Sequence, residues 1–263
     1  MGTNRGTFEG DLQEVSFVKY FNKNKNLFNE YLSAFQDTSS LTYLLRVTTK
    51  QYSKLSGKKV YTRADAYLAN FTDNSVIDLL MSNDYYLDEE ILKANNINFK
   101  AVEFSGISIK LSDSNKFQIL KLQPNSFANL FGNHELGAGA SLFCNRIEEL
   151  PKNNDLILGW GSSIEKMNLF FNDITKNNLK FQLDQEMCRK IKQSSEQKIH
   201  SLIDNDISLQ KKIFNGVNLY DEPYTAYYFS KNNTIQLLTY IPFTVTTGSG
   251  RSHGDYTIVL KPR

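Results

Sequence analysis

Two runs in the first half of the chain have the composition of β-strands, and they constrain the fold more than any other feature of the sequence. Residues 60–71 (VYTRADAYLANF) precede the turn residues TDN, and residues 99–113 (FKAVEFSGISIKLSD) contain Gly106 in their interior. Residues 76–97, between the two runs, favour inserted turns and one short helix. The first half of the chain is therefore predicted to hold two strands joined by an insertion.

A helical pattern comes before these strands. In residues 8–35, Glu14, Val18 and Phe21 share one stripe, because steps of four and seven residues return to nearly the same direction on a helix. Glu14 is therefore predicted to point inward, towards the rest of the fold.

The later segments alternate between helical and strand patterns. Ser162 stands three residues before Glu165, which is the spacing of a capping box at the start of a helix. The C-terminal part favours several strands, with a glycine-rich loop before the last one. Helices around a small mixed sheet predict an α/β or α+β fold. The other segments expected to be helical or mixed are residues 41–55, 125–131, 139–150 and 183–216, the last of which ends near Gly216.

Composition limits the class of protein. Lys and Arg total 30 against 28 Asp and Glu, and the net charge of +2 neither requires nor excludes a polyanionic partner. Cys144 and Cys188 are far apart and outside any CxxC spacing, which predicts buried free thiols rather than a zinc site or a disulfide framework. The N-terminus lacks the apolar core of a signal peptide, and residues 235–245 are too short to span a bilayer, so we expect a soluble intracellular protein.

The sharpest candidate site combines Asp65, Ser108 and Lys110. Hydrolysis of a phosphodiester needs a divalent cation that neutralises the phosphate and activates a water, and such a cation prefers oxygen ligands. Asp65 supplies a carboxylate from the first strand run. Ser108 and Lys110 are two residues apart, so their side chains leave the same face of the second run. There the lysine can orient the water and stabilise developing charge.

These residues resemble the motifs of the PD-(D/E)xK nuclease superfamily, and of its type II restriction endonucleases in particular. TRADAYLA resembles the first acidic motif, GISIKLSDSNKFQILK resembles the second, and NRGTFEGDLQE is similar to the leading helix, which often brings a glutamate towards the site. The resemblance covers the first half of the chain. It implies Asp65 as a metal ligand, Lys110 as the catalytic lysine, and a restriction-endonuclease-like core in which helices flank a mixed sheet.

Two positions depart from the family pattern. Ala64 stands where the pattern has proline, and Ser108 occupies the place of the second acidic residue. We favour Glu14 as the source of the missing carboxylate, because an inward carboxylate on the first helix needs a cation or several donors. Glu103 is the alternative. It is seven residues from Lys110, so a regular strand sends it to the opposite face unless a bulge intervenes.

Each residue of this candidate site also has an ordinary structural explanation. Asp65, at the end of a strand, can pair with Arg63 or with a backbone amide. Lys110 can be a solvated residue on an exposed sheet face, and Glu14 can pair with a nearby lysine.

The loop TTGSGRSHG near the C-terminus is a second candidate site. Its glycines allow close approach to phosphate, Arg251 can read guanine edges or clamp a phosphate, and Ser252 and His253 are neighbouring donors. Lys121 is a further predicted DNA contact. The alternative is a hairpin connection whose glycines satisfy turn geometry. The segment GNHE, residues 132–135, resembles one block of the metallophosphoesterases, but their DxH and GDxxD blocks are absent from the sequence, so we expect a structural role for it.

No internal repeat or low-complexity linker divides the sequence, so a single domain is expected over residues 1–263, with a catalytic core near 1–135 and a candidate recognition region at 217–263. The resemblance implies a Mg²⁺-dependent type II restriction endonuclease of the bacterial cytoplasm that cuts double-stranded DNA and leaves 5′-phosphate ends. A homodimer follows if the target is palindromic, and a DNA methyltransferase is implied as a functional companion. The alternatives are another nuclease of the superfamily, for repair or mobile-element processing, and a non-catalytic DNA-binding protein with a decayed site.

Overall fold

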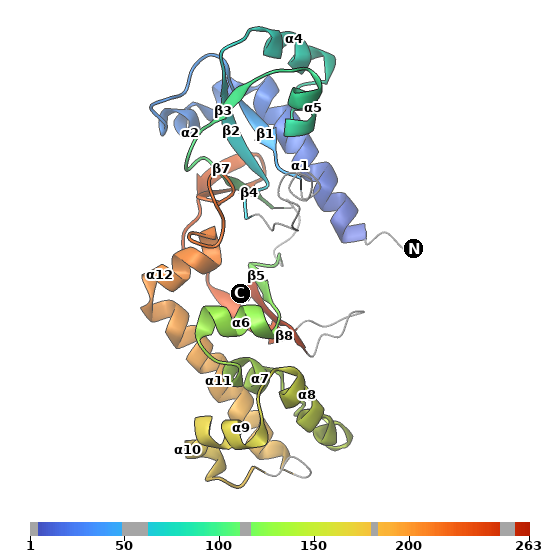
Figure 1. The fold of residues 1–263 in the computed structure, drawn as a ribbon, viewed down its shortest axis with the longest axis vertical. Coiled ribbons are helices and arrows are strands. Elements are labelled where there is room, and N and C mark those ends of the chain that lie inside the picture. Colours follow the sequence, from blue (N-terminus) through green and yellow to red (C-terminus); the bar gives the residue numbers. More distant parts are fainter. Residues whose placement is uncertain (1–4, 49–62, 111–116, 180–183, 248–255) are drawn as a thin grey trace. The chain divides into compact units, whose positions relative to one another are not determined.

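The computed structural model describes residues 5–48, 63–110, 117–179, 184–247 and 256–263 (Figure 1). By its backbone contacts the chain divides into two compact units. The first unit is Met1–Ser114 with Phe214–Tyr240, and the second is Asn115–Ile213 with Ile241–Arg263. Residues 115–135 therefore belong to a different unit from Asp65 and Lys110, and the C-terminal strands are shared between the two units. The single restriction-endonuclease-like domain stays a prediction.

The first unit is built on a mixed six-stranded sheet, which confirms the predicted α+β class. The strands follow the order β1–β2–β4–β6–β7, and β3 also pairs with β2. β4 and β6 run parallel, whereas the other neighbouring pairs are antiparallel. The strands are β1 (Thr42–Arg46), β2 (Ala66–Phe71), β3 (Phe99–Ala101), β4 (Ile107–Ile109), β6 (Tyr228–Lys231) and β7 (Thr234–Leu237).

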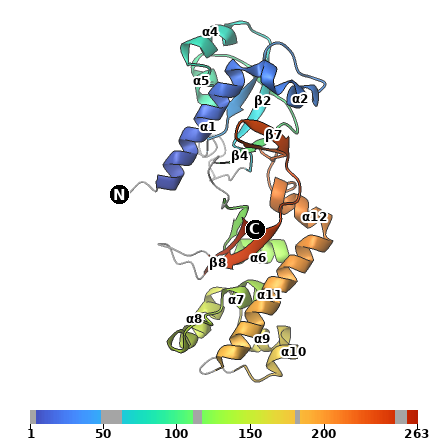
Figure 2. The same ribbon diagram turned by 180° about the vertical axis from the view of Figure 1, so that it is seen from behind.

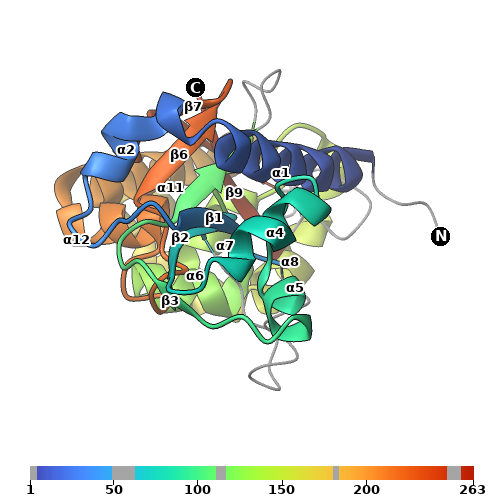
Figure 3. The ribbon, with the colours of Figure 1, turned by 90° about the horizontal axis from the view of Figure 1, so that it is seen from above.

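Helices cover both faces of β1 and β2, because these strands are apolar on both sides. Leu44 packs in the core formed with α1 (Arg5–Lys23), whereas its neighbour Leu45 packs in the core formed with α4 (Ser75–Ser82) and α5 (Glu89–Ala94). Figure 3 shows α1 and α5 on opposite sides of the two strands. On the α1 side the buried residues include Phe17, Val18, Phe21, Phe28, Tyr31, Ala66 and Leu68.

Two predicted segments differ from the structure. The helix expected over residues 8–35 ends at Lys23, and the chain continues as the 3₁₀ helix η1 (Lys25–Phe28) and the short helix α2 (Asn29–Ser33). Thr42–Arg46, expected to be helical or mixed, form strand β1. Consecutive leucines in this strand are buried on opposite faces of the sheet, and this two-sided burial hides the alternation by which a strand is usually recognised.

The run predicted as one strand over residues 99–113 is interrupted between β3 and β4. Strand β3 ends at Ala101, and Phe104 in the following segment has a positive φ of 62°, which is not a strand conformation. The side chain of Ser105 replaces part of the lost ladder, since its Oγ accepts a hydrogen bond from Leu68 N at 3.0 Å and donates one to Val102 O at 2.6 Å.

Gly106 lets the chain continue into β4 against the segment that precedes β6. Its carbonyl oxygen accepts hydrogen bonds from the N–H groups of both Tyr227 and Tyr228, at 2.9 and 3.1 Å. A Cβ at this position would lie 2.0 Å from the carbonyl oxygen of Thr225. Glycine is therefore required here for close backbone approach.

The second unit joins a three-stranded antiparallel sheet to a group of helices. The sheet has the order β5–β9–β8, with β5 at Leu120–Leu122, β8 at Phe243–Thr247 and β9 at Ile258–Pro262. The long predicted helix is confirmed as α11 (Gln185–Asn205), followed by α12 (Ile207–Gln210) and the π-helical turn η3 (Lys211–Asn215). The remaining helices are α6 (Pro124–Phe131), α7 (Glu135–Ser141), η2 (Ile147–Lys152), α8 (Asn153–Gly159), α9 (Ile164–Phe170) and α10 (Asn172–Thr175).

Small residues allow α7 to pack closely against α11 (Figure 2). A Cβ at Gly139 of α7 would lie 2.2 Å from the hydroxyl of Ser195 on α11. Cys144 and Cys188 are buried free thiols, as predicted. Among the helices in the described ranges, none combines the length and the apolar character needed to cross a bilayer.

The capping box predicted at Ser162 is wrong by one residue. Helix α9 is capped by Ser163, whose hydroxyl accepts a hydrogen bond from Lys166 N at 3.3 Å. Ser162 instead donates to Glu135 Oε1 at 2.7 Å. Glu165 is therefore the second residue of α9, and its spacing from Ser162 does not identify the capping serine.

A pair of glycine substitutions tests the role of Gly106. Gly106→Ala is expected to destabilise the first unit by at least about 2 kcal/mol, because the new methyl group overlaps a backbone carbonyl that cannot rotate away. In Gly10→Ala the added Cβ meets nothing within 4 Å and lies inside α1, so a gain of roughly 0.5–1 kcal/mol is expected.

The measurement is hydrogen exchange of the most protected amides of β2, since the single tryptophan, Trp160, lies in the second unit and does not report on the first. Equal protection in the two variants would contradict the proposed close approach at Gly106.

Candidate functional site

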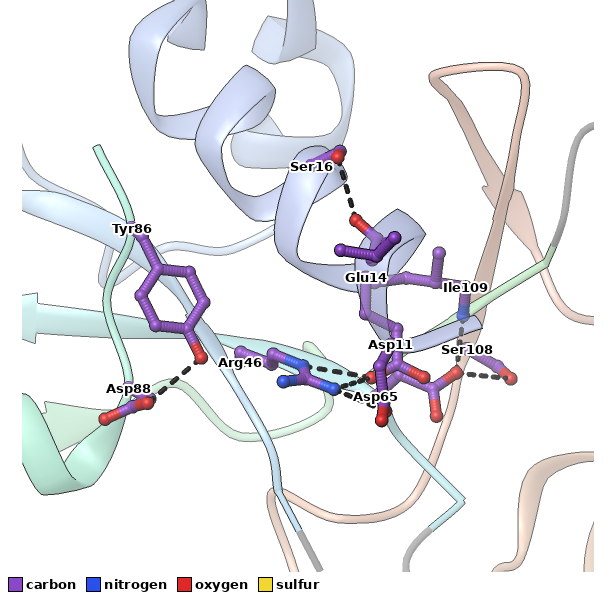
Figure 4. Close-up of polar contacts among 10 residues, drawn as sticks. Asp11, Glu14, Ser16, Arg46, Asp65, Tyr86, Asp88, Ser108 and Ile109 are labelled. Atoms are coloured by element: carbon purple, nitrogen blue, oxygen red, sulfur yellow. Dashed lines mark hydrogen bonds and ion pairs between the residues drawn. The ribbon is translucent and has the colours of Figure 1, made fainter. Parts of the chain in front are cut away.

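Asp65 directly precedes β2 and is fixed by its backbone and its side chain. Its N–H donates to Ile107 O at 2.8 Å, and its carbonyl accepts from Val47 N at 2.9 Å. The carboxylate oxygen Oδ2 accepts from Ile109 N at 2.6 Å and from Ser108 Oγ at 3.2 Å (Figure 4). The carboxylate is therefore held where the ends of β1, β2 and β4 meet.

Lys110 immediately follows β4, two residues after the buried Ser108. Its N–H donates to Ser230 O at 2.9 Å, and its carbonyl accepts from Gln13 Nε2 at 3.3 Å. Burial lowers the pKa of the Lys110 ammonium, and the nearby carboxylate of Asp65 opposes this effect. The structure thus places Ser108 in contact with Asp65, and the ammonium of Lys110 within electrostatic reach of the same carboxylate.

Glu14 lies on α1 and is largely buried, with 22% of its side chain exposed, in line with the predicted inward direction. Its Oε2 accepts hydrogen bonds from Nε and Nη2 of Arg46, at 3.0 and 2.7 Å. Arg46 Nη2 also donates to Asp11 Oδ1 at 2.8 Å (Figure 4). The cation beside Glu14 is therefore the arginine of β1, rather than the lysine considered in the sequence analysis.

Arg46, Asp11 and Tyr86 are site residues that sequence reasoning missed. Burial raises the pKa of Tyr86 to about 12, and its hydroxyl donates to Asp88 Oδ2 at 3.0 Å. The signal for Arg46 was present in the run LTYLLRV, where one arginine stands among apolar residues. A charged residue in a strand that is buried on both faces requires a partner, which here is the first helix.

The two inward carboxylates of this cluster repel each other. Burial raises the pKa of Glu14 to about 7, the Asp65 carboxylate raises it as well, and the hydrogen bonds from Arg46 act in the opposite direction. Glu14 therefore titrates near neutral pH, where its charge depends on which cations lie near it.

The carboxylates of Asp65 and Glu14 are oxygen donors of the kind that a divalent cation prefers. Among the described residues no hydrogen-bond donor reaches Asp65 Oδ1, which leaves one carboxylate oxygen available as a ligand. A cation between Asp65 and Glu14 would offset the repulsion that raises the Glu14 pKa. Mg²⁺ is commonly held by one or two carboxylates together with substrate phosphates. Within the described ranges no group of three or more His, Cys, Asp or Glu side chains is placed to hold a metal ion.

The structure does not place the other candidate residues in this cluster. Glu103 is exposed in the segment between β3 and β4. Together with Asp37 and Lys100 it lines a hollow, and Asp65 is not among the described residues of that lining. Lys121 is exposed in β5 of the second unit. Three predicted DNA contacts lie outside the described residues: Arg251, Ser252 and His253.

The segment GNHE has local structural contacts. Asn133 Oδ1 accepts from Leu136 N at 3.0 Å at the start of α7, and Glu135 accepts from Ser162 as described above. Gly132 ends α6 with a positive φ of 81°. These contacts agree with the structural role expected for this segment.

No protein-family model matches the chain, and no curated protein matches its sequence. The residues of the cluster themselves indicate what chemistry it can perform. It brings together two carboxylates, a partly buried amine and a guanidinium at the ends of three strands and the inner face of one helix.

The raised pKa of Glu14 makes the stability of the first unit pH-dependent. A carboxyl whose pKa rises from 4.5 to about 7 on folding contributes stability that is fully present below pH 4.5 and is lost as the pH rises through 7. In the presence of EDTA, the stability of the wild type relative to Glu14→Gln should therefore fall by about 1–3 kcal/mol between pH 5 and pH 8. Hydrogen exchange of β1 amides measures this difference. A difference that stays constant or grows with pH would show that Glu14 is not held as described.

Proposed function

We propose that the chain is a Mg²⁺-dependent type II restriction endonuclease that hydrolyses phosphodiester bonds of double-stranded DNA at a specific sequence. The observation that carries this proposal is the fixed carboxylate of Asp65, which lies within electrostatic reach of both Lys110 and Glu14. Acidic ligands and an amine around one point are what metal-assisted phosphodiester hydrolysis requires. The resemblance of TRADAYLA and GISIKLSDSNKFQILK to the superfamily motifs supports the same activity.

Each residue has a defined part in the proposed reaction. Bound Mg²⁺ supplies neutralisation of the phosphate and a lowered pKa for the attacking water. Asp65 and Glu14 would hold the cation, and Lys110 would donate hydrogen bonds to the attacking water and to a phosphate oxygen as negative charge develops. Ser108 is a positioning residue, because its hydroxyl orients the Asp65 carboxylate.

Partners of the protein follow from the same proposal. The DNA products would carry 5′-phosphate and 3′-hydroxyl ends, as the resemblance implies. A palindromic target would require a homodimer whose two-fold symmetry matches that of the DNA. A DNA methyltransferase of the same specificity would protect the host.

One observation favours a second candidate function, a DNA-binding protein without catalysis. Ser108 supplies a hydroxyl where the family motif has an acid, and the Arg46 guanidinium already binds Glu14. In that protein the cluster would serve stability alone. A third candidate, a repair or mobile-element nuclease of the superfamily, would cut at DNA ends or at unusual structures instead of at one sequence.

Two substitutions test the proposed chemistry. Asp65→Asn keeps an oxygen that can accept from Ile109 N but removes the charge, and Lys110→Ala removes the amine. Each is expected to lower the rate of Mg²⁺-dependent DNA cleavage by at least about 100-fold, while DNA affinity measured in EDTA is retained.

The matched controls are Asp37→Asn and Lys100→Ala, which remove an exposed ion pair of the same unit. They should cut at the wild-type rate. Full cleavage activity in either Asp65→Asn or Lys110→Ala would overturn the assignment of these residues.

Ser108→Asp tests whether the site accepts a cation. The new carboxylate would lie beside Asp65, so repulsion is expected to destabilise the metal-free first unit, and Mg²⁺ is expected to bind about tenfold more tightly than to the wild type, because one more carboxylate is available as a ligand. The isosteric Ser108→Asn controls for the change of size. Calorimetric titration with Mg²⁺ measures the affinities. Equal affinities in the three proteins would argue against a cation at this position.

A further inference from the structure

A hollow of about 550 Å³ lies beside the candidate catalytic cluster in the first unit. It is lined by residues of α1, by Ile109 and Lys110 at the end of β4, and by the tip of the β6–β7 hairpin. Its volume is within the range of pockets that hold small organic groups. Because Lys110 belongs both to this lining and to the Asp65 cluster, anything bound in the hollow is adjacent to the proposed point of cleavage.

The hairpin tip is a rigid turn that presents two amide side chains. Asn232 and Asn233 have positive φ angles of 53° and 58°, as in a type I′ turn, and both are exposed. The turn is fixed by the pairing of Lys231 with Thr234, whose Oγ1 donates to Lys231 O at 2.7 Å. The backbone conformation at both asparagines is therefore set by the hairpin itself.

The chemistry of the lining suits a nucleobase. It contains the amides of Gln13, Asn232 and Asn233, the hydroxyl of Ser16 and the partly exposed ring of Tyr20, and among the described lining residues there is no carboxylate. Amide side chains pair with the donor and acceptor groups of base edges, and an aromatic ring offers a surface for a base or sugar. A lining without acidic groups also tolerates a neighbouring phosphate.

Gln13 connects this hollow to the candidate active site. Its Nε2 donates to the carbonyl of Lys110 at 3.3 Å, which ties α1 to the residue that follows β4. A change in the position of one side chain of the hollow can therefore alter the position of Lys110.

We propose that this hollow binds the nucleotide that flanks the scissile phosphate, and that Asn232 and Asn233 of the β6–β7 hairpin read its base. The inference rests on the proposed endonuclease function and adds to it the residues that select the sequence at the cut.

Paired substitutions test this proposal without disturbing the turn. Asn232→Gly with Asn233→Gly removes both amides but keeps the positive φ angles, which glycine adopts freely. The matched control is Asn96→Gly with Asn218→Gly, two exposed asparagines of the same unit with φ angles of 54° and 62° that do not line the hollow. A second variant, Asn232→Asp with Asn233→Asp, also tolerates positive φ and replaces amide donors by acceptors.

Two measurements are made on all four proteins. In the first, duplexes of random sequence are cut in the presence of Mg²⁺ and the ends are sequenced. In the second, the same duplexes are selected by binding in EDTA and then sequenced. In Asn232→Gly with Asn233→Gly, the base preference at the flanking positions should fall by about tenfold or more. In Asn232→Asp with Asn233→Asp, the preference should shift towards cytosine. The control, Asn96→Gly with Asn218→Gly, should keep the wild-type preference.

The outcomes separate the two proposals. If the wild type cuts and Asn232→Gly with Asn233→Gly produces ends with the same base preference, the hollow is not a recognition site, whereas the endonuclease proposal is retained. If the wild type does not cut, the endonuclease proposal fails, and the binding selection alone tests whether the hollow reads a base. A base preference that is lost in Asn232→Gly with Asn233→Gly supports recognition by the hollow. A preference that is unchanged, or absent from the wild type, overturns it.

Discussion

The carboxylate of Asp65 is the constraint on which the candidate site depends. It accepts hydrogen bonds from the backbone of Ile109 and the hydroxyl of Ser108, while its own backbone pairs with Ile107 and Val47. These contacts fix one acid at the junction of three strand ends. Its electrostatic effects on Glu14 and Lys110 follow from that position, since both groups are buried beside it.

The same contacts allow Asp65 both to support the fold and, under the proposed function, to bind a cation. One oxygen, Oδ2, is used for the backbone amide, as the structural explanation of this aspartate predicts. Among the described residues the other oxygen receives no hydrogen bond, so it remains able to bind a cation. The carboxylate is thus oriented before any cation binds, which reduces the ordering cost of binding.

Arg46 determines how Glu14 behaves in the absence of metal. Its guanidinium binds Glu14 through two nitrogens and also reaches Asp11, so it supplies positive charge on the inner side of α1. A divalent cation at Asp65 would compete with Arg46 for Glu14. Under the proposed function, the balance between these two cations would separate a working nuclease from a protein in which the cluster only stabilises the fold.

Sequence reasoning recovered the parts of this structure that local pattern determines. The inward direction of Glu14 followed from the spacing of apolar residues on one helix. The close backbone approach at Gly106 was not predicted, because it depends on the carbonyl of Thr225, more than a hundred residues later. Nor was the pairing of Arg46 with Glu14 predicted, because the strand character of β1 was hidden by burial on both faces.

The hairpin of β6 and β7 illustrates the same limit. Its turn is formed by the neighbouring residues Asn232 and Asn233, but its parallel pairing with β4, which brings the hairpin beside Lys110, joins segments far apart in sequence. A pattern within one segment specifies the turn, and tertiary packing specifies what lies next to it.

The most direct test of the central claim is to incubate the purified protein with unmethylated phage DNA and Mg²⁺ and to sequence the resulting ends. Discrete fragments whose 5′-phosphorylated ends share one sequence are expected, with no cleavage when EDTA replaces Mg²⁺. DNA that stays intact in Mg²⁺, or is cut equally well in EDTA, would contradict a metal-dependent endonuclease centred on Asp65.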